Sequence, residues 1–160
     1  MDQNGTRPPD NDIDAFISAS RAIVALAVAS LAELDDRISL TQFRALVVLD
    51  GVGTMRAADL ADRLGTSASS VTRMCDRLVA DSLLRRMENP SNRREVLLTV
   101  TAPGSRLVER VLARRRLSVQ RILDHLNDGE RAATVRAFKV FAEHAAPLID
   151  AQVVHEWPVL

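Results

Sequence analysis

Residues 55–101 constrain the fold of this chain more than any other segment. Three apolar residues at helical spacing predict a short first helix: Leu60, Ala61 and Leu64. Gly65 should end that helix, because the residue just past a helix end often needs a positive φ. Ser67 can then cap a second helix by accepting a hydrogen bond from a free N–H group in its first turn. The segment therefore predicts two helices joined by a tight turn.

The second predicted helix has an apolar face and a polar face. The apolar positions are Val71, Met74, Cys75, Leu78 and Val79. The polar positions are Ser69, Ser70, Thr72, Arg73, Asp76 and Arg77. Small polar side chains and arginines on the second of two such helices are what reading a DNA major groove requires. The alternative is an ordinary solvated helix face.

A β-hairpin should follow this helix. Residues 84–88 could form its first strand, and residues 89–92 are turn formers. The second strand is predicted by alternation of Val96, Leu98 and Val100 with Leu97 and Thr99. Arg93 and Arg94 would lie at the hairpin tip. Two helices followed by an arginine-tipped hairpin form a winged helix-turn-helix, so we expect a mainly α fold with a small β-hairpin wing.

Eight side chains are the candidates for DNA contact: Ser67, Ser69, Ser70, Thr72, Arg73, Arg77, Arg93 and Arg94. Arg73 could pair bidentately with a guanine edge, and the hydroxyls could contact bases or phosphates. Arg77 could contact a phosphate or pair with an acid such as Asp81, four residues on. Asp76 should orient an arginine of the wing or of a helix, because it would repel phosphate. Arg93 and Arg94 at the hairpin tip would lie beside the reading helix, where a minor groove attracts guanidinium groups and phosphates are within reach.

The distribution of charge agrees with this placement, although the net charge is zero. Residues 56–94 hold eight arginines against five acids, whereas residues 1–38 hold three arginines against seven acids. The basic excess thus lies on the segment that would neutralise phosphates. The run Arg114-Arg115-Arg116 is expected to be a solvated helix face.

The segments on either side of residues 39–101 predict long helices. Residues 1–11 are polar and are expected to be a disordered arm. From Asp12 to about residue 38 a helix is apolar over most of its circumference, which favours a partner subunit as its cover. Residues 102–150 predict two more helices, the second capped by Asn127 and Glu130, and residues 151–160 form a tail. Ser39 and Gln42 predict a capping box at the start of the central part.

The order and spacing of several short segments resemble the MarR family of bacterial transcription regulators. The matching segments are Leu40-Thr41-Gln42-Phe43-Arg44-Ala45-Leu46, Asp59-Leu60-Ala61, Leu64-Gly65, Ser70-Val71-Thr72-Arg73, Asp76-Arg77-Leu78, Asn92-Arg93-Arg94, Leu98-Thr99-Val100-Thr101 and Pro103-Gly104. The resemblance covers residues 12–150 and implies a homodimer that represses transcription from a pseudo-palindromic operator. The resemblance also implies that Arg94 is the wing arginine that enters the minor groove, with Arg93 as a phosphate contact. One departure is Asn92, where the family usually has an Asp that orients this arginine.

The resemblance also implies a small aromatic or apolar effector, bound between the terminal helices and the winged part. Phe43, Val47, Arg106 and Arg110 are the candidate liners, with core packing as the alternative for Phe43 and Val47. A winged-helix module for protein–protein contact, without DNA binding, is the alternative function.

Other functions find little support in the residues. There is no nucleophile–base pair or phosphate loop, so we expect no enzyme activity and no cofactor. His125, His144 and His155 with Glu143 match no close-set metal motif, so no metal site is expected. Cys75 should be a buried, inert thiol rather than a redox sensor. Without a signal peptide, and with an apolar run at 22–32 too short to span a bilayer, we expect a cytoplasmic protein without a membrane partner.

Overall fold

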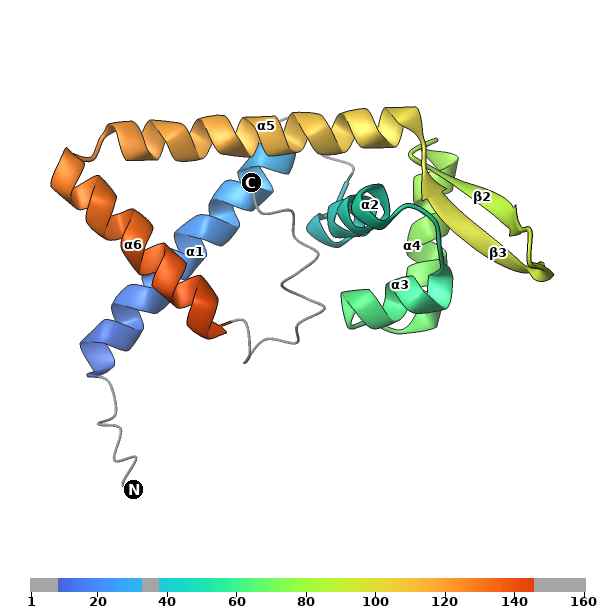
Figure 1. Cartoon of the computed structure of the whole chain (residues 1–160), viewed down its shortest axis with the longest axis horizontal. Coiled ribbons are helices and arrows are strands. Elements are labelled where there is room, and N and C mark those ends of the chain that lie inside the picture. Colours follow the sequence, from blue (N-terminus) through green and yellow to red (C-terminus); the bar gives the residue numbers. More distant parts are fainter. Residues whose placement is uncertain (1–8, 33–37, 146–160) are drawn as a thin grey trace, which may run out of the picture.

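The computed structural model describes residues 9–32 and 38–145. Its elements are, in order, α1 (Asp10–Ala32), α2 (Leu40–Val52), β1 (Met55–Arg56), α3 (Ala57–Leu64), α4 (Ala68–Ala80), β2 (Leu84–Asn89), β3 (Asn92–Val100), α5 (Ala102–Asp124) and α6 (Asp128–Ala145). Figure 1 shows α2, α3, α4 and the sheet gathered at one end of α5, with α1 and α6 toward its other end. The predicted fold, mainly α with a small wing, is confirmed.

α2 lies at the centre of the core, and its start is fixed by local hydrogen bonds. The backbone N–H of Gln42 donates to Ser39 Oγ at 3.2 Å, and the Ser39 N–H donates to Gln42 Oε1 at 2.8 Å. This is the predicted capping box. The helix then buries Phe43, Leu46 and Leu49.

The two helices of the predicted helix-turn-helix are α3 and α4. Gly65 has φ +64°, and its N–H donates to carbonyls of the last turn of α3, as its role as a helix stop required. Ser67 caps α4, since its Oγ accepts from the Ser70 N–H at 3.3 Å. The buried side of α4 carries Val71, Cys75 and Leu78. These apolar contacts fix which face of α4 points outward.

The sheet has three strands in the order β1-β3-β2, all antiparallel. Met55 and Arg56, which directly precede the first helix of the predicted pair, form β1 and pair with Leu98 and Leu97 of β3. The turn of the hairpin is at Pro90 and Ser91, so Arg93 and Arg94 belong to β3 and not to the tip itself. The register shifts between Glu88 and Asn89, close to that turn.

α1 begins two residues earlier than the sequence suggested. The N–H groups of Asp12 and Ile13 donate to the carbonyl of Pro9, so residues 10 and 11 are helical and not part of an arm. Residues 1–8, 33–37 and 146–160, which include the rest of the arm and the tail, lie outside the described residues.

At 23 residues α1 is long and apolar enough to cross a membrane, by length and composition only. The apolar run at 22–32, which by itself is too short for a span, is only the second half of this helix.

α5 connects the winged part to the terminal helices. Its cap, Thr101, accepts from the Gly104 N–H at 3.2 Å and donates to the Ser82 carbonyl at 2.7 Å. The predicted second capping box is present as well, with Asn127 and Glu130 exchanging hydrogen bonds of 3.0 Å at the start of α6. α1 and α6 meet through the rings of Phe16 and Phe141, whose centroids are 4.6 Å apart. Within the described part of the chain, α6 buries none of its side chains.

Candidate nucleic-acid interface

The outer face of α4 carries the candidate reading residues. Ser69, Thr72, Arg73 and Arg77 are exposed, and Ser70 is half-buried. They lie opposite the buried Val71, Cys75 and Leu78, so the packing that holds α4 in the core also turns this face outward. A helix presented in this way can enter a major groove without disturbing its own packing.

The hydroxyl groups at the start of α4 are already arranged by one another. Ser67 Oγ donates to Ser70 Oγ at 2.9 Å and lies 3.2 Å from Ser69 Oγ. Thr72 Oγ1 donates to the Ala68 carbonyl at 2.9 Å. Since Ser67 also accepts the capping hydrogen bond, its oxygen serves mainly to start the helix. Ser69 and Ser70 are the serines of this group best placed to accept a further partner.

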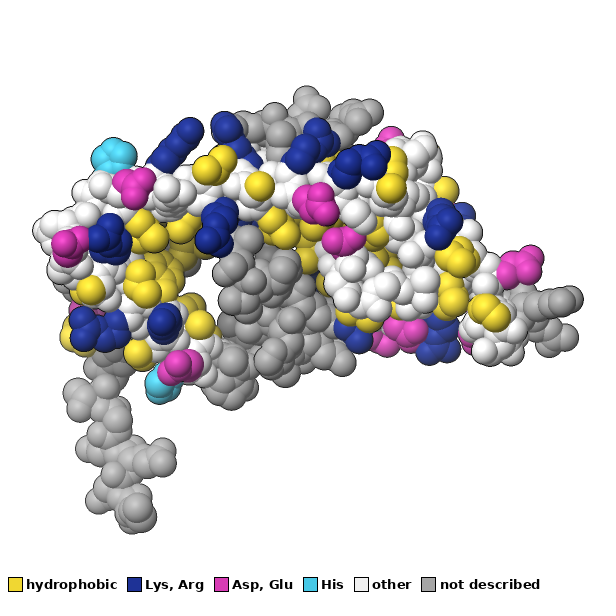
Figure 2. Space-filling model, turned by 45° about the horizontal axis from the view of Figure 1, so that its top comes forward, with side chains coloured by type: hydrophobic (Ala, Val, Ile, Leu, Met, Phe, Trp, Pro, Cys, Tyr) yellow, Lys and Arg dark blue, Asp and Glu magenta, His cyan; other side chains and the backbone are white. Residues whose placement is uncertain are grey.

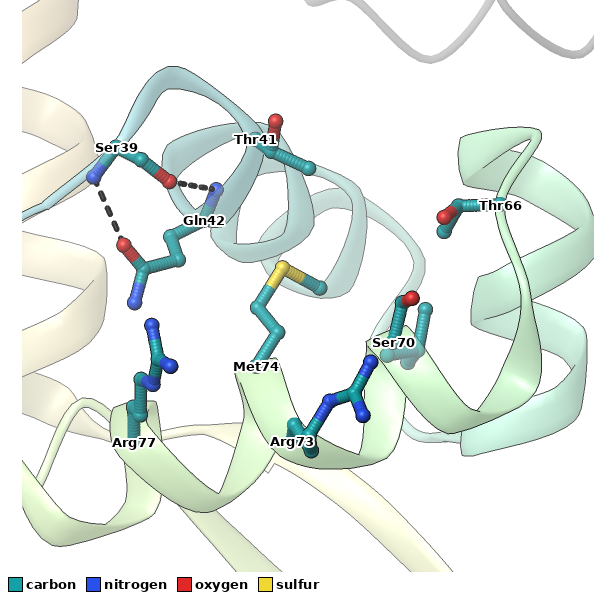
Figure 3. A pocket seen from close by; sticks show the side chains of 9 residues that line it. Ser39, Thr41, Gln42, Thr66, Ser70, Arg73, Met74 and Arg77 are labelled. Atoms are coloured by element: carbon teal, nitrogen blue, oxygen red, sulfur yellow. Dashed lines mark hydrogen bonds between the residues drawn. The ribbon is translucent and has the colours of Figure 1, made fainter.

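Arg73 and Arg77 project into a cleft between α4 and the start of α2 (Figure 3). The cleft has a volume of about 450 Å³. Its lining residues are Ser39, Thr41, Gln42, Thr66, Ser70, Val71, Arg73, Met74 and Arg77. Two guanidinium groups and the N-terminus of α2, which carries partial positive charge, make this cleft attractive to an anion such as a DNA phosphate.

The residues that α2 contributes to this cleft were not among the sequence candidates. In the sequence, the capping box at Ser39 and Gln42 indicates only the start of a helix, and nothing local distinguishes Thr41 as a site residue. A helix start close to a reading helix is itself a signal for phosphate contact. That proximity depends on how α2 packs against α4, which the spacing of residues in either helix does not encode.

Asp76 is paired with the wing, as expected. Its Oδ1 accepts a hydrogen bond from Nη2 of Arg86 on β2, and both side chains are about half-exposed. This ion pair neutralises the acid on the outer face of α4 and links that helix to the wing. Among the described residues no ion pair joins Arg77 to Asp81, and the choice between a phosphate contact and a pair with an acid stays a prediction. Arg77 lines the cleft.

The wing places Arg93 and Arg94 near the start of β3, immediately after the turn. Their backbone belongs to the strand that pairs with both β1 and β2. Their backbone therefore lies at the end of the sheet nearest the hairpin turn. The neighbouring strand is β2, whose Arg86 contacts Asp76. Their contact with DNA stays a prediction.

The four candidate effector residues do not meet in one pocket. Phe43 and Val47 are buried in the core. Arg106 and Arg110 lie on the exposed side of α5 and line an open cleft of about 380 Å³ with Pro103 and Glu109. Core packing therefore accounts for Phe43 and Val47 in the described chain, and an effector role for all four stays a prediction.

The remaining sequence candidates have local explanations. Cys75 is buried, and this burial raises the pKa of its thiol to about 11, so the expectation of a buried thiol is confirmed. The Nδ1 atoms of His125 and His144 lie 2.6 and 2.8 Å from carbonyls one turn earlier in their own helices. The described residues contain no group of three metal-ligating side chains, and His155 lies outside them. Arg115 is half-buried, which lowers its pKa, so the run 114–116 is not solvated throughout.

Known proteins share both the sequence pattern and the fold. The model of the MarR family matches residues 38–96. The crystal structure of Rv1404 from Mycobacterium tuberculosis is 37% identical, covers 89% of this chain and 97% of its own, and superposes with a TM-score of 0.80. A cysteine-to-serine mutant of Escherichia coli MarR is 25% identical over 85% of this chain and 97% of its own, with a TM-score of 0.67.

A third relative is the HTH-type transcriptional repressor MdtR of Bacillus subtilis, 34% identical over 56% of this chain and 57% of its own length. This chain spans between half and two thirds of the length of the curated relatives it matches. The family match coincides with the winged helix-turn-helix, and the fold agrees over nearly the whole chain. The chain therefore belongs to the MarR family, whose members are transcription regulators and not enzymes.

Proposed function

We propose that this chain acts as a homodimer that binds a pseudo-palindromic operator and represses transcription. The observation that carries this proposal is the outer face of α4, where exposed hydroxyls, Arg73 and Arg77 stand beside the wing. Among its relatives, MdtR is a transcriptional repressor, and the cysteine-to-serine mutant of E. coli MarR has been crystallised with operator DNA.

The dimer is supported by apolar side chains that the described chain leaves uncovered. Phe16 of α1 is 51% exposed, Ile122 of α5 is 54% exposed and Phe138 of α6 is 47% exposed. Figure 2 shows hydrophobic side chains on the open face between α5 and α6. Contiguous apolar surface of this kind marks an interaction site. A second copy, related by two-fold symmetry, would cover it and place two α4 helices about one DNA turn, ~34 Å, apart.

A dimer on an operator would act in the cytoplasm and block access to the promoter. A small aromatic or apolar effector that changes the separation of the two α4 helices would weaken binding, because both half-sites must be engaged together. The exposed Arg106 and Arg110 on α5 are the candidate residues for such an effector if it carries an anionic group.

The alternative, a winged-helix module that binds only proteins, finds less support on α4. A protein-binding helix would present aromatic or methionine side chains at its centre. Here the exposed positions of α4 carry no aromatic or methionine side chain, since Met74 is half-buried; they are Ala68, Ser69, Thr72, Arg73, Asp76, Arg77 and Ala80. These polar side chains suit base edges and phosphates better than an apolar partner.

The test begins with selection of bound sites from a random pool of duplex DNA. We expect an enriched sequence with two inverted half-sites about one turn apart. Sedimentation of the free protein at micromolar concentration should show a dimer. A folded monomer, or enrichment of a single unrepeated half-site, would overturn the proposal.

The variants Arg73→Ala and Arg94→Ala then separate two kinds of contact. Loss of a bidentate base contact at Arg73 should cost ~1–3 kcal/mol and relax specificity at one base pair per half-site. Loss of Arg94 should weaken all sites more evenly and flatten the salt dependence. If Arg73→Ala lowered affinity equally for every single-base variant, Arg73 would be a phosphate contact. If Arg94→Ala left affinity and salt slope unchanged, the wing would not contact DNA.

A further inference from the structure

Glu95 occupies the position on β3 directly after the two wing arginines, and it contacts two other elements. Asn89 of β2 donates from Nδ2 to Glu95 Oε2 at 2.8 Å. Nη1 of Arg56 on β1 lies 3.6 Å from Glu95 Oε1. Each carboxylate oxygen of Glu95 thus has a partner of its own, one on either neighbouring strand.

Arg56 is held in turn by the first helix of the helix-turn-helix. Its Nε donates to Asp59 Oδ2 at 2.9 Å and its Nη2 donates to Asp59 Oδ1 at 2.7 Å. This bidentate pair fixes the plane of the guanidinium group, and it raises the pKa of Arg56 and lowers that of Asp59. A continuous path therefore runs from α3 through Asp59, Arg56 and Glu95 to Asn89. We call these four residues the wing anchor.

The position of the wing anchor gives it influence over the orientation of the hairpin. β1 pairs with β3 only at Leu97 and Leu98, so Glu95 lies just beyond the last of these pairs. Nearer the turn, the register of β2 and β3 shifts between Glu88 and Asn89. The wing anchor thus lies where the hairpin extends beyond the rest of the protein and where the regular pairing of β2 with β3 is interrupted. An irregularity in strand pairing bends and twists the strand locally, so contacts that hold the strand at this point affect the direction of the hairpin.

We propose that Glu95 is a positioning residue for the wing, held by Arg56 and Asn89 and acting through the strand that carries Arg93 and Arg94. This inference rests on the proposed binding of DNA by the wing. Glu95 would orient the wing without the need for an acid at position 92, where the chain has the uncharged Asn92. Asp59 and Arg56 tie that orientation to the helix-turn-helix itself.

The direction in which one substitution changes operator affinity distinguishes a positioning role of Glu95 from a simple effect of its charge. Glu95→Gln removes a negative charge close to DNA, so on electrostatic grounds alone it should tighten binding. If Glu95 positions the wing, the loss of its contact with Arg56 should instead weaken operator binding, roughly 2- to 5-fold, the range expected for an exposed ion pair. Glutamine keeps the length of the side chain and can still accept from Asn89, which limits the change to the charge.

Glu88→Gln is the matched control, since Glu88 is an exposed acid on the other strand of the same wing. This variant should bind the operator as tightly as the unmodified protein or slightly more tightly. The double variant Arg56→Glu with Glu95→Arg restores a pair of opposite charges. It should bind more tightly than the separate effects of Arg56→Glu and Glu95→Arg add up to, because simple charge effects are additive and a restored pair is not.

The measurement is operator affinity of the full chain at several salt concentrations, with thermal melting to establish that each variant is folded. We expect weaker binding and a flatter salt slope for Glu95→Gln at an unchanged melting temperature. If Glu95→Gln bound as tightly as Glu88→Gln, or the charge-swapped pair bound no more tightly than its separate substitutions add up to, the inference would be wrong. If the unmodified protein bound no selected DNA, the proposed function itself would fail, which is a separate outcome.

Discussion

Gly104 lies in the first turn of α5, where the helix passes very close to the base of the wing. A Cβ added there would lie 2.3 Å from the carbonyl oxygen of Leu83 and 2.9 Å from Cγ1 of Val100. The first of these is a backbone atom next to β2, so it is not free to rotate away. Gly104→Ala must therefore push α5 away from the sheet or distort the segment around Leu83.

Gly104→Ala changes the free energy of unfolding in two opposite ways, by overpacking and by a higher helix propensity. Overpacking by one carbon in a close-packed region typically costs about 1–3 kcal/mol. Alanine is better than glycine within a helix by about 1 kcal/mol, but that gain is reduced in the first turn. We expect a net loss of stability, and a melting temperature lower by roughly 2–8 °C for a chain of this size.

Gly51→Ala is the matched control. Gly51 lies in the last turn of α2, and no described atom comes within 4 Å of the Cβ position. This substitution should be neutral or should stabilise by up to about 1 kcal/mol. Both variants should be melted at one protein concentration, because the stability of a dimer depends on concentration. A Gly104→Ala protein that melts at or above the unmodified protein would refute the reasoning.

Two further predictions follow from the pKa shifts. Burial raises the pKa of Cys75 to about 11, so at pH 8 the folded protein should react with a disulfide reagent far more slowly than the unfolded chain, and fast reaction of the folded protein would contradict this. The hydrogen bond from Arg56 lowers the pKa of Asp59, so the stability that Asp59 contributes is present above its unfolded pKa and is lost as the pH falls through its folded pKa. Asp59→Asn should therefore reduce the loss of stability on acidification, as measured by urea unfolding between pH 7 and pH 3, and an unchanged acid dependence would count against the pair.

Features that depend on neighbours in the sequence were predictable. The capping box of Ser39 and Gln42, the left-handed Gly65 and the cap at Ser67 each involve residues within a few positions of one another. Their hydrogen bonds are formed by the local backbone and do not depend on the rest of the fold. The pairing of Asp76 with an arginine was also predictable, because an acid on a phosphate-facing helix needs a cation nearby, and the structure shows that this arginine belongs to the wing.

Features that depend on tertiary packing were not predictable. β1 has only two residues, too few to show a strand period, and it exists because β3 offers Leu97 and Leu98 as partners. The cleft between α2 and α4 combines residues 39–42 with residues 66–77, whose proximity no local spacing reveals. The wing anchor joins Arg56 to Glu95, nearly forty positions away, for the same reason. α1 began earlier than expected because the carbonyl of Pro9 accepts the first hydrogen bonds of the helix.

α5 is one uninterrupted helix of 23 residues that joins the wing at one end to α6 at the other. At 1.5 Å per residue its length is about 34 Å, and it contains no proline or glycine beyond its first turn at which it could kink. Such a helix transmits rotation as a rigid rod. Over a length of ~34 Å, a tilt of ~5° about the end near α6 displaces the end near the wing by ~3 Å. That distance is comparable to one base-pair step of DNA, ~3.4 Å, so a small change in how two subunits pack is sufficient to move a reading helix out of register.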